Sequence, residues 1–121
     1  MAKRTIGALK ETPKIEEKSS AKTRKIKVQL IGKISSATQE QLDLFAKAEE
    51  FLKAKGFEVW NPLKLIEGQT WEWYMKKCIA SLVGMDFVFL LPSWQSSEGA
   101  SIEAGLAKRL KIPNLEVWDV I

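Results

Sequence analysis

The sequence predicts an α/β fold built on a parallel sheet, and three observations support that prediction. Four short apolar segments, at 26–31, 57–60, 86–92 and 114–120, alternate with three longer segments of helical periodicity. Alternation of this kind is typical of parallel strands joined by crossover helices. The chain has 121 residues, 45% of them hydrophobic, so it is long and apolar enough for one domain with its own core.

The first strand and the first helix are predicted from local patterns. The stretch IKVQLI at 26–31 alternates and then becomes fully apolar, as expected of a strand that enters a core. A helix is expected over 38–56, because Thr38 and Gln41 have the spacing of a capping box. Gly56 supplies its C-terminal stop. The predicted inner face of this helix consists of Leu42, Phe45, Ala48 and Leu52.

The middle of the chain continues the alternation. A short strand over 57–60 is closed by Asn61 and the proline after it, and a second helix is expected over 70–85. The apolar stripe of that helix consists of Trp71, Tyr74, Met75, Cys78 and Leu82. The most apolar segment, 86–92, is expected to be a central strand, with Asp86 as a turn residue at its start.

The last helix and strand complete the predicted topology. The helix is expected over 96–110, with Ser96 and Ser97 as candidate N-caps, and Pro113 separates it from a strand over 114–120. Right-handed crossovers, with the two most buried strands in the middle, give the strand order 2-1-3-4. This is the three-layer sandwich of flavodoxin-like and Rossmann-like folds, with about four parallel strands.

The net charge of +4 is concentrated at the N-terminus. Residues 1–25 contain eight Lys or Arg and three Glu, whereas the remainder contains eleven basic and twelve acidic residues. We interpret 1–25 as a basic, disordered leader and 26–121 as the domain. A basic leader suggests nucleic acid only weakly, through salt-dependent contacts.

The residue inventory excludes several classes of site. The chain has no histidine and one cysteine, which excludes an internal disulfide, a Ser-His-Asp or Cys-His catalytic group and a four-ligand Cys/His zinc site. No clustered carboxylates suggest another metal site, so we expect neither metal nor cofactor. The chain lacks a run of about 18 apolar residues and a secretory signal, so we expect a cytoplasmic protein with no membrane partner.

Ligands of such sheets bind beyond the carboxyl ends of the strands, where the strand order reverses. A helix N-terminus there binds anions, and an aromatic side chain there stacks on a base or sugar. The candidate ligand-binding residues at this edge are Gly32, Lys33, Ile34, Asn61, Trp94, Ser97 and Gly99. Helix capping by Ser97, core packing by Trp94 and simple solvation of Lys33 are the structural alternatives.

Glu103 is the candidate catalytic residue. In a helix over 96–110 its neighbours one turn away are Gly99, Ala100, Leu106 and Ala107. A carboxylate on a small and apolar face is costly, which indicates a function beneath the expected site. The structural alternative is a surface side chain, or one paired with Lys77 or Lys33.

Three stretches of the sequence resemble a known family. They are VQLIGKIS, AEEFLKAKGFEVWNPLKL and WYMKKCIASLVGMDFVFLLPSWQSSEGASIEAGLA, and the similarity extends over roughly 26–118. The chain resembles the nucleoside 2-deoxyribosyltransferase superfamily, and within it the small DUF4406-type branch. The most specific element is Ser97-x-Gly99-x-x-x-Glu103.

The resemblance implies roles for two of these residues. In the transferases, the glutamate at the place of Glu103 is the nucleophile that attacks the anomeric carbon of the 2-deoxyribosyl group. Deoxynucleoside 5′-monophosphate N-glycosidases have a serine at the place of Ser97, where nucleoside transferases have an aspartate. A serine at a helix N-terminus binds a phosphate that a carboxylate would repel, so the resemblance implies a nucleoside 5′-monophosphate or similar ligand.

Cys78 departs from the family pattern, because relatives have a catalytic aspartate at the corresponding place. A thiol does not supply that carboxylate's charge, so a non-catalytic nucleotide-binding or protein-interaction module is the alternative function. A packed, inert thiol is the structural interpretation of Cys78. Relatives often build their sites across dimers, so the resemblance also implies a homodimer, with Trp71, Trp73 and Tyr74 as interface candidates.

Overall fold

The computed structural model describes residues 24–116. Most of the predicted leader, and with it the suggested nucleic-acid contact, lies outside the described residues, as does the end of the strand predicted over 114–120. Four parallel strands form one sheet in the order β2-β1-β3-β4, which confirms the predicted topology. The elements are β1 (Lys27–Ile31), α2 (Gln39–Ala54), β2 (Glu58–Trp60), η1 (Pro62–Lys64), α3 (Trp71–Leu82), β3 (Phe87–Leu90), η2 (Trp94–Ser96), α4 (Glu98–Arg109) and β4 (Asn114–Glu116).

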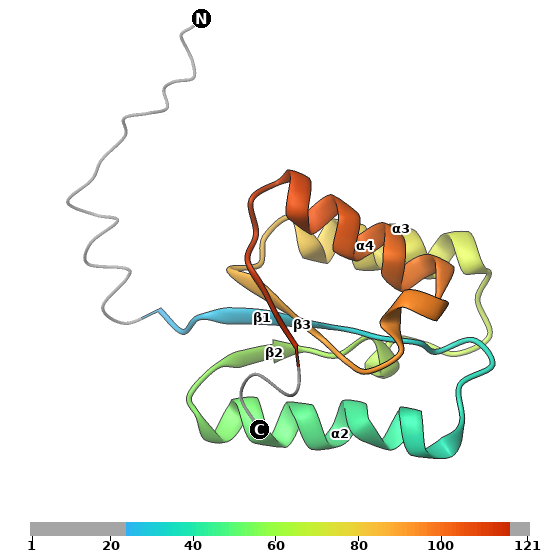
Figure 1. Cartoon of the computed structure of the whole chain (residues 1–121), viewed down its shortest axis with the longest axis horizontal. Coiled ribbons are helices and arrows are strands. Elements are labelled where there is room, and N and C mark those ends of the chain that lie inside the picture. Colours follow the sequence, from blue (N-terminus) through green and yellow to red (C-terminus); the bar gives the residue numbers. More distant parts are fainter. Residues whose placement is uncertain (1–23, 117–121) are drawn as a thin grey trace, which may run out of the picture.

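The sheet lies between two helical layers, as predicted. Helix α2 covers one face, and α3 and α4 lie together on the other (Figure 1). Phe45 and Leu52 of α2 pack on β1 and β3 in one half of the core, and Ala100 and Ala107 of α4 pack in the other half. None of the helices in the described part has the length and apolarity needed to cross a membrane.

The predicted start and stop signals of α2 are present. The Thr38 hydroxyl accepts from the Gln41 N–H at 3.1 Å, and the Gln41 side chain accepts from the Thr38 N–H at 2.9 Å. Gly56 follows the helix with a φ of +96°, a conformation that favours glycine. Phe45, Ala48 and Leu52 are buried as predicted, together with Glu49.

The start of α4 differs in one respect from the prediction. Ser97 is its N-cap, and its hydroxyl accepts from the Ala100 N–H at 3.2 Å. Ser96 does not cap α4: it ends the short helix η2, and its hydroxyl donates to the Ser93 carbonyl at 2.9 Å. Ser93 has a φ of 72°, so the chain turns sharply after β3 before it enters η2.

Asp86 is a structural residue at the amino-terminal end of β3, as predicted. Its carboxylate accepts from the Lys27 N–H at 2.7 Å and from the Arg24 guanidinium at 2.8 Å. The Arg24 guanidinium and the Lys27 N–H both lower the pKa of Asp86. The carboxylate therefore joins β3 to the start of β1, at the end of the sheet opposite the candidate site.

Candidate functional site

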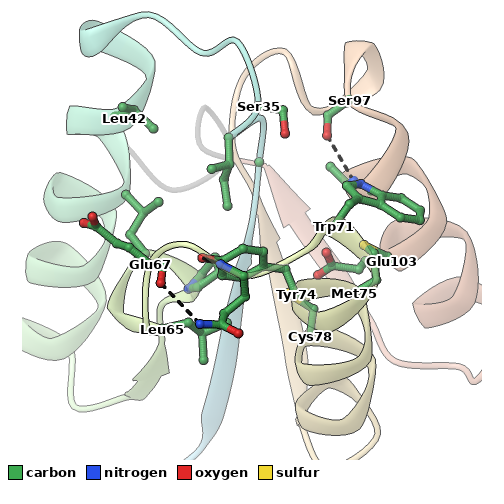
Figure 2. Close-up of a pocket in the computed structure, with 17 residues that line it drawn as sticks. Ser35, Leu42, Leu65, Glu67, Trp71, Tyr74, Met75, Cys78, Ser97 and Glu103 are labelled. Atoms are coloured by element: carbon green, nitrogen blue, oxygen red, sulfur yellow. Dashed lines mark hydrogen bonds between the residues drawn. The ribbon is translucent and has the colours of Figure 1, made fainter.

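A cavity of about 430 Å³ opens at the carboxyl ends of the strands, within the size range of small-molecule sites. Its walls come from the loops after β1 and β2 and from helices α2, α3 and α4 (Figure 2). The lining residues are Gly32, Ile34, Ser35, Leu42, Pro62, Leu63, Leu65, Glu67, Gln69, Trp71, Tyr74, Met75, Cys78, Ser97, Gly99, Ala100 and Glu103. No group of three potential metal ligands of the His, Cys, Asp and Glu types occurs in residues 24–116.

Glu103 projects from α4 to the cavity and is only 7% exposed. Ala100, Ala104 and Ala107 on the same helix are also buried, so the carboxylate lies on the small and apolar face expected from its spacing. Its hydrogen-bond partners among the described residues are Gln29 of β1 and Cys78 of α3, not the predicted alternatives Lys77 or Lys33. The interpretation of Glu103 as a surface side chain is therefore wrong.

Burial dominates the electrostatics of Glu103. Loss of solvent raises the pKa of its carboxyl to about 7, although hydrogen bonds from Gln29 and Cys78 act in the opposite direction. The group is therefore close to half ionised at neutral pH. A carboxyl poised in this way is characteristic of functional sites, because a proton is gained or lost at little cost.

Cys78 lies beside Glu103 on the same side of the cavity (Figure 2). Burial and the neighbouring carboxylate raise the pKa of this thiol to about 12. The thiol is therefore protonated at neutral pH, and its S–H donates to the Glu103 carboxyl. These features fit the predicted packed thiol, and they place Cys78 next to the carboxylate.

Close packing explains Gly99. A Cβ built on Gly99 would lie 2.9 Å from the Met75 sulfur and 3.7 Å from the Trp71 ring nitrogen. The glycine therefore brings the first turn of α4 against α3 and leaves the N-terminus of α4 open to the cavity. The Ser97 oxygen accepts one helix N–H, and the proton of its hydroxyl stays available to a ligand.

Five of the predicted site residues line the cavity and three do not. Gly32, Ile34, Ser97, Gly99 and Glu103 line it. Lys33 lies beside the cavity, with its ammonium 3.4 Å from the Ser96 carbonyl near the start of α4. Trp94 packs against the core half formed by α4, and its ring nitrogen is buried.

Asn61 is a structural residue behind the cavity wall. Its amide donates to Glu49 at 2.9 Å, and its side-chain oxygen accepts from the Leu63 N–H at 2.9 Å. Lys53 and Lys64 complete the pairing of Glu49 at 2.7 and 3.1 Å. Although burial opposes ionisation, these partners together lower the pKa of Glu49 to about 2. Asn61 therefore anchors η1, which forms part of the wall.

Replacing Asn61 by alanine is expected to destabilise the fold by about 1–3 kcal/mol, because the buried Glu49 oxygen and the Leu63 N–H lose their partner. Urea denaturation followed by tryptophan fluorescence measures this difference. Lys64→Ala is the matched control, since it removes only an exposed partner of Glu49 and is expected to cost less. An equal loss in the two variants would contradict the structural role of Asn61.

The comparisons with known proteins agree with this fold. A family model described as "Domain of unknown function (DUF4406)" matches residues 26–115. The chain belongs to the DUF4406 family. No curated protein sequence matches it.

A solved structure supports the fold of this DUF4406 protein. It is that of a 2-deoxyribosyltransferase from the psychrotolerant bacterium Bacillus psychrosaccharolyticus, with a TM-score of 0.61. The two chains are 24% identical, and the alignment covers 74% of this chain and 70% of that chain. This likeness establishes the fold, and the family match confirms the DUF4406-type branch inferred from the sequence.

Sequence reasoning missed two parts of the DUF4406 site. The first is Gln29, which bonds Glu103; its signal was a polar residue between Val28 and Leu30, in the part of the strand that enters the core. The second is the segment 65–69, whose Leu65, Glu67 and Gln69 line the cavity. Tyr74 holds this segment by donating to the Ile66 carbonyl at 2.7 Å. No sequence pattern indicates that contact.

The aromatic side chains that line the cavity are not the predicted Trp94. Trp71 and Tyr74 of α3 line it, whereas Trp94 does not. Trp71 is 43% exposed, so its ring is available for stacking at the mouth. Trp73 packs edge-on against Tyr74 and lies under the Lys77 ammonium. The homodimer through these aromatic residues stays a prediction.

Proposed function

We propose that this DUF4406 protein binds a (deoxy)nucleoside 5′-monophosphate and cleaves or transfers its N-glycosidic bond, with Glu103 as the nucleophile. The observation that supports this most is the buried carboxyl of Glu103 on the wall of the cavity. Burying a carboxylate in such a place costs more free energy than its structural contacts return to the fold. The same carboxylate would stabilise the positive charge that develops on the sugar in the transition state, and this gives it a function.

The chemistry follows that of a retaining glycosidase. An oxygen of ionised Glu103 forms a bond to the anomeric carbon as the bond to the base nitrogen breaks, and the base leaves with that electron pair. Water, or the N–H nitrogen of a second base, then displaces the carboxylate, and the proton that it loses is taken up by the base that left. The first outcome is hydrolysis and the second is base transfer.

The structural neighbour supports the same class of reaction. It is a 2-deoxyribosyltransferase described as a biocatalyst for the synthesis of nucleosides, and its fold matches that of this chain. The aromatic rings of Trp71 and Tyr74 provide a surface on which a base would stack. Leu42, Leu63 and Leu65 add the apolar surface that nucleoside sites require.

The start of α4 is where we place the 5′-phosphate. The first N–H groups of an α-helix have no partner within the helix, and its dipole favours an anion there. Ser97 offers a hydroxyl proton at the same point, and the ammonium of Lys33 lies near it. Glu67 lies across the cavity, so phosphate is favoured only at the α4 end (Figure 2).

Lys33→Ala is expected to raise the KM for a 5′-monophosphate roughly fivefold, because an exposed ammonium near the phosphate contributes modestly. The KM for the corresponding nucleoside is expected to stay unchanged. Initial rates of base release, measured by chromatography at several substrate concentrations, compare the two. Equal changes in both KM values would remove Lys33 from the phosphate site.

Incubation with a panel of nucleosides, deoxynucleosides and their 5′-monophosphates tests the proposed function. Base release, detected by chromatography, is expected chiefly from the monophosphates. Release from nucleosides alone would overturn the phosphate assignment and keep the glycosidic reaction.

Cys78 favours a second candidate, a nucleotide-binding module without turnover. The thiol lies beside Glu103 where relatives have an aspartate, and it is neutral at pH 7. Binding of a monophosphate measured by calorimetry, with no base released during long incubation, would support this second function and overturn the first.

A further inference from the structure

Gln29 is a polar residue in the centre of an apolar sheet. It is 0% exposed in β1, between Val28 and Leu30, and β1 lies between β2 and β3. Its backbone pairs with Trp60 on one side and Val88 on the other. Burial of an amide at such a position is costly unless its hydrogen bonds are replaced.

The nitrogen of the Gln29 side chain connects three elements. It donates to the Cys78 carbonyl of α3 at 3.0 Å and to the Glu103 carboxyl of α4 at 3.1 Å. A carbonyl only accepts, so the Cys78 contact fixes which end of the amide is the nitrogen. The orientation of the donor toward Glu103 therefore does not depend on the charge of that carboxyl.

The oxygen of the same amide has no partner. It is buried and accepts no hydrogen bond from the described residues. An unpaired buried acceptor of this kind is destabilising, so an aliphatic side chain at this position would give a more stable sheet. Local rules of packing are often broken where a side chain has a function, and among the described residues the side chain of Gln29 bonds the candidate nucleophile Glu103.

We infer that Gln29 is the positioning residue of Glu103, which holds one oxygen of the carboxyl and favours its ionised form. Cys78 is the other group that donates to Glu103, and Glu67 is the charged residue across the cavity. An amide cannot lose its proton in this pH range, so it supports the carboxylate at every pH. The consequence for catalysis rests on the proposed function, whereas the effect on the carboxyl does not.

The direction of the effect follows from hydrogen bonding. A donor to the ionised form lowers the pKa of a carboxyl, and the Gln29 contact does so against the effect of burial. Without the amide, Glu103 would stay protonated to higher pH. A protonated carboxyl is a poor nucleophile, so the amide extends the pH range of the reaction downward.

Gln29→Met tests the inference, because methionine keeps the volume of glutamine and removes the amide. The titration of Glu103 is followed by carboxyl ¹³C NMR on the whole protein, with the signal assigned by its absence in Glu103→Gln. We expect the midpoint to rise by about one pH unit or more relative to wild type. An unchanged midpoint would overturn the inference and leave Gln29 as a core residue only.

Val28→Ala is the matched control, since it disturbs the same strand on the face that packs against α2, away from Glu103. Its midpoint is expected to equal that of wild type; a rise as large as in Gln29→Met would overturn the inference. If Gln29→Met does not fold, Gln29→Leu, which also lacks the amide, gives the same comparison.

Base release measured against pH separates the inference from the proposed function. If wild type is active, the rise of activity with pH is expected to move to higher pH in Gln29→Met. If wild type releases no base while the NMR midpoint still moves, the proposed function fails and the positioning of Glu103 by Gln29 stands.

Discussion

Glu103→Gln is expected to reduce base release at least about a thousand-fold, the scale of loss for removal of a nucleophile. Glutamine has nearly the same shape as glutamate, so the small face of α4 stays filled. It lacks the carboxylate that forms the bond to the anomeric carbon. The loss is therefore expected in kcat, with little change in substrate binding. Chromatography of the free base under single-turnover conditions measures it.

Glu50→Gln is the matched control for this experiment, because Glu50 is exposed on α2 and does not line the cavity. Its rate is expected to equal that of wild type. Full activity in Glu103→Gln would contradict the nucleophile assignment. A loss that appears only as weaker binding would show that the carboxylate holds the ligand without attacking it.

The order of elements and the strand topology were predictable because they depend on local patterns. Thr38 and Gln41 lie three residues apart, so the sequence alone contains the whole capping box. The turn at Gly56 is similarly local. Topology follows from alternation and from the fixed hand of crossovers, which do not depend on individual side chains.

The residues of the site were predictable only where their spacing within one helix shows that they share a face. Glu103 and Gly99 belong to one helix, so their spacing shows that they share a face. Gln29 is 74 residues away from Glu103 along the chain, and no local pattern predicts that bond. Asn61 does not line the cavity, and its side chain bonds Glu49, twelve residues earlier, which no local pattern predicts. Trp94 packs against the core half formed by α4 and does not line the cavity.

Glu103 also makes the stability of the fold depend on pH. Its pKa is about 7 in the folded protein against an ordinary value of 4.5. Between these values the unfolded chain has lost the proton and the folded protein has kept it, so stability falls as pH rises. Below about 4.5 both states are protonated and the effect of this group disappears. Above about 7 both are ionised and the full destabilisation is present.

Glu103→Gln removes this dependence. The shift corresponds to about 3 kcal/mol, so the variant is expected to gain that much relative to wild type between pH 4 and pH 8. Urea denaturation at one-unit steps of pH, followed by tryptophan fluorescence, measures the difference. Glu49, whose pKa is lowered to about 2, destabilises both proteins alike in acid, so its contribution cancels.

The comparison with Glu50→Gln decides what the gain means. That variant replaces an exposed carboxylate, and its stability relative to wild type is expected to stay constant over the same pH range. If Glu103→Gln also shows a constant difference, the carboxyl titrates near its ordinary value and is not held in a costly state. If the gain appears while activity is lost, one residue both destabilises the fold and performs the reaction, as expected where a fold tolerates a costly carboxylate for its function.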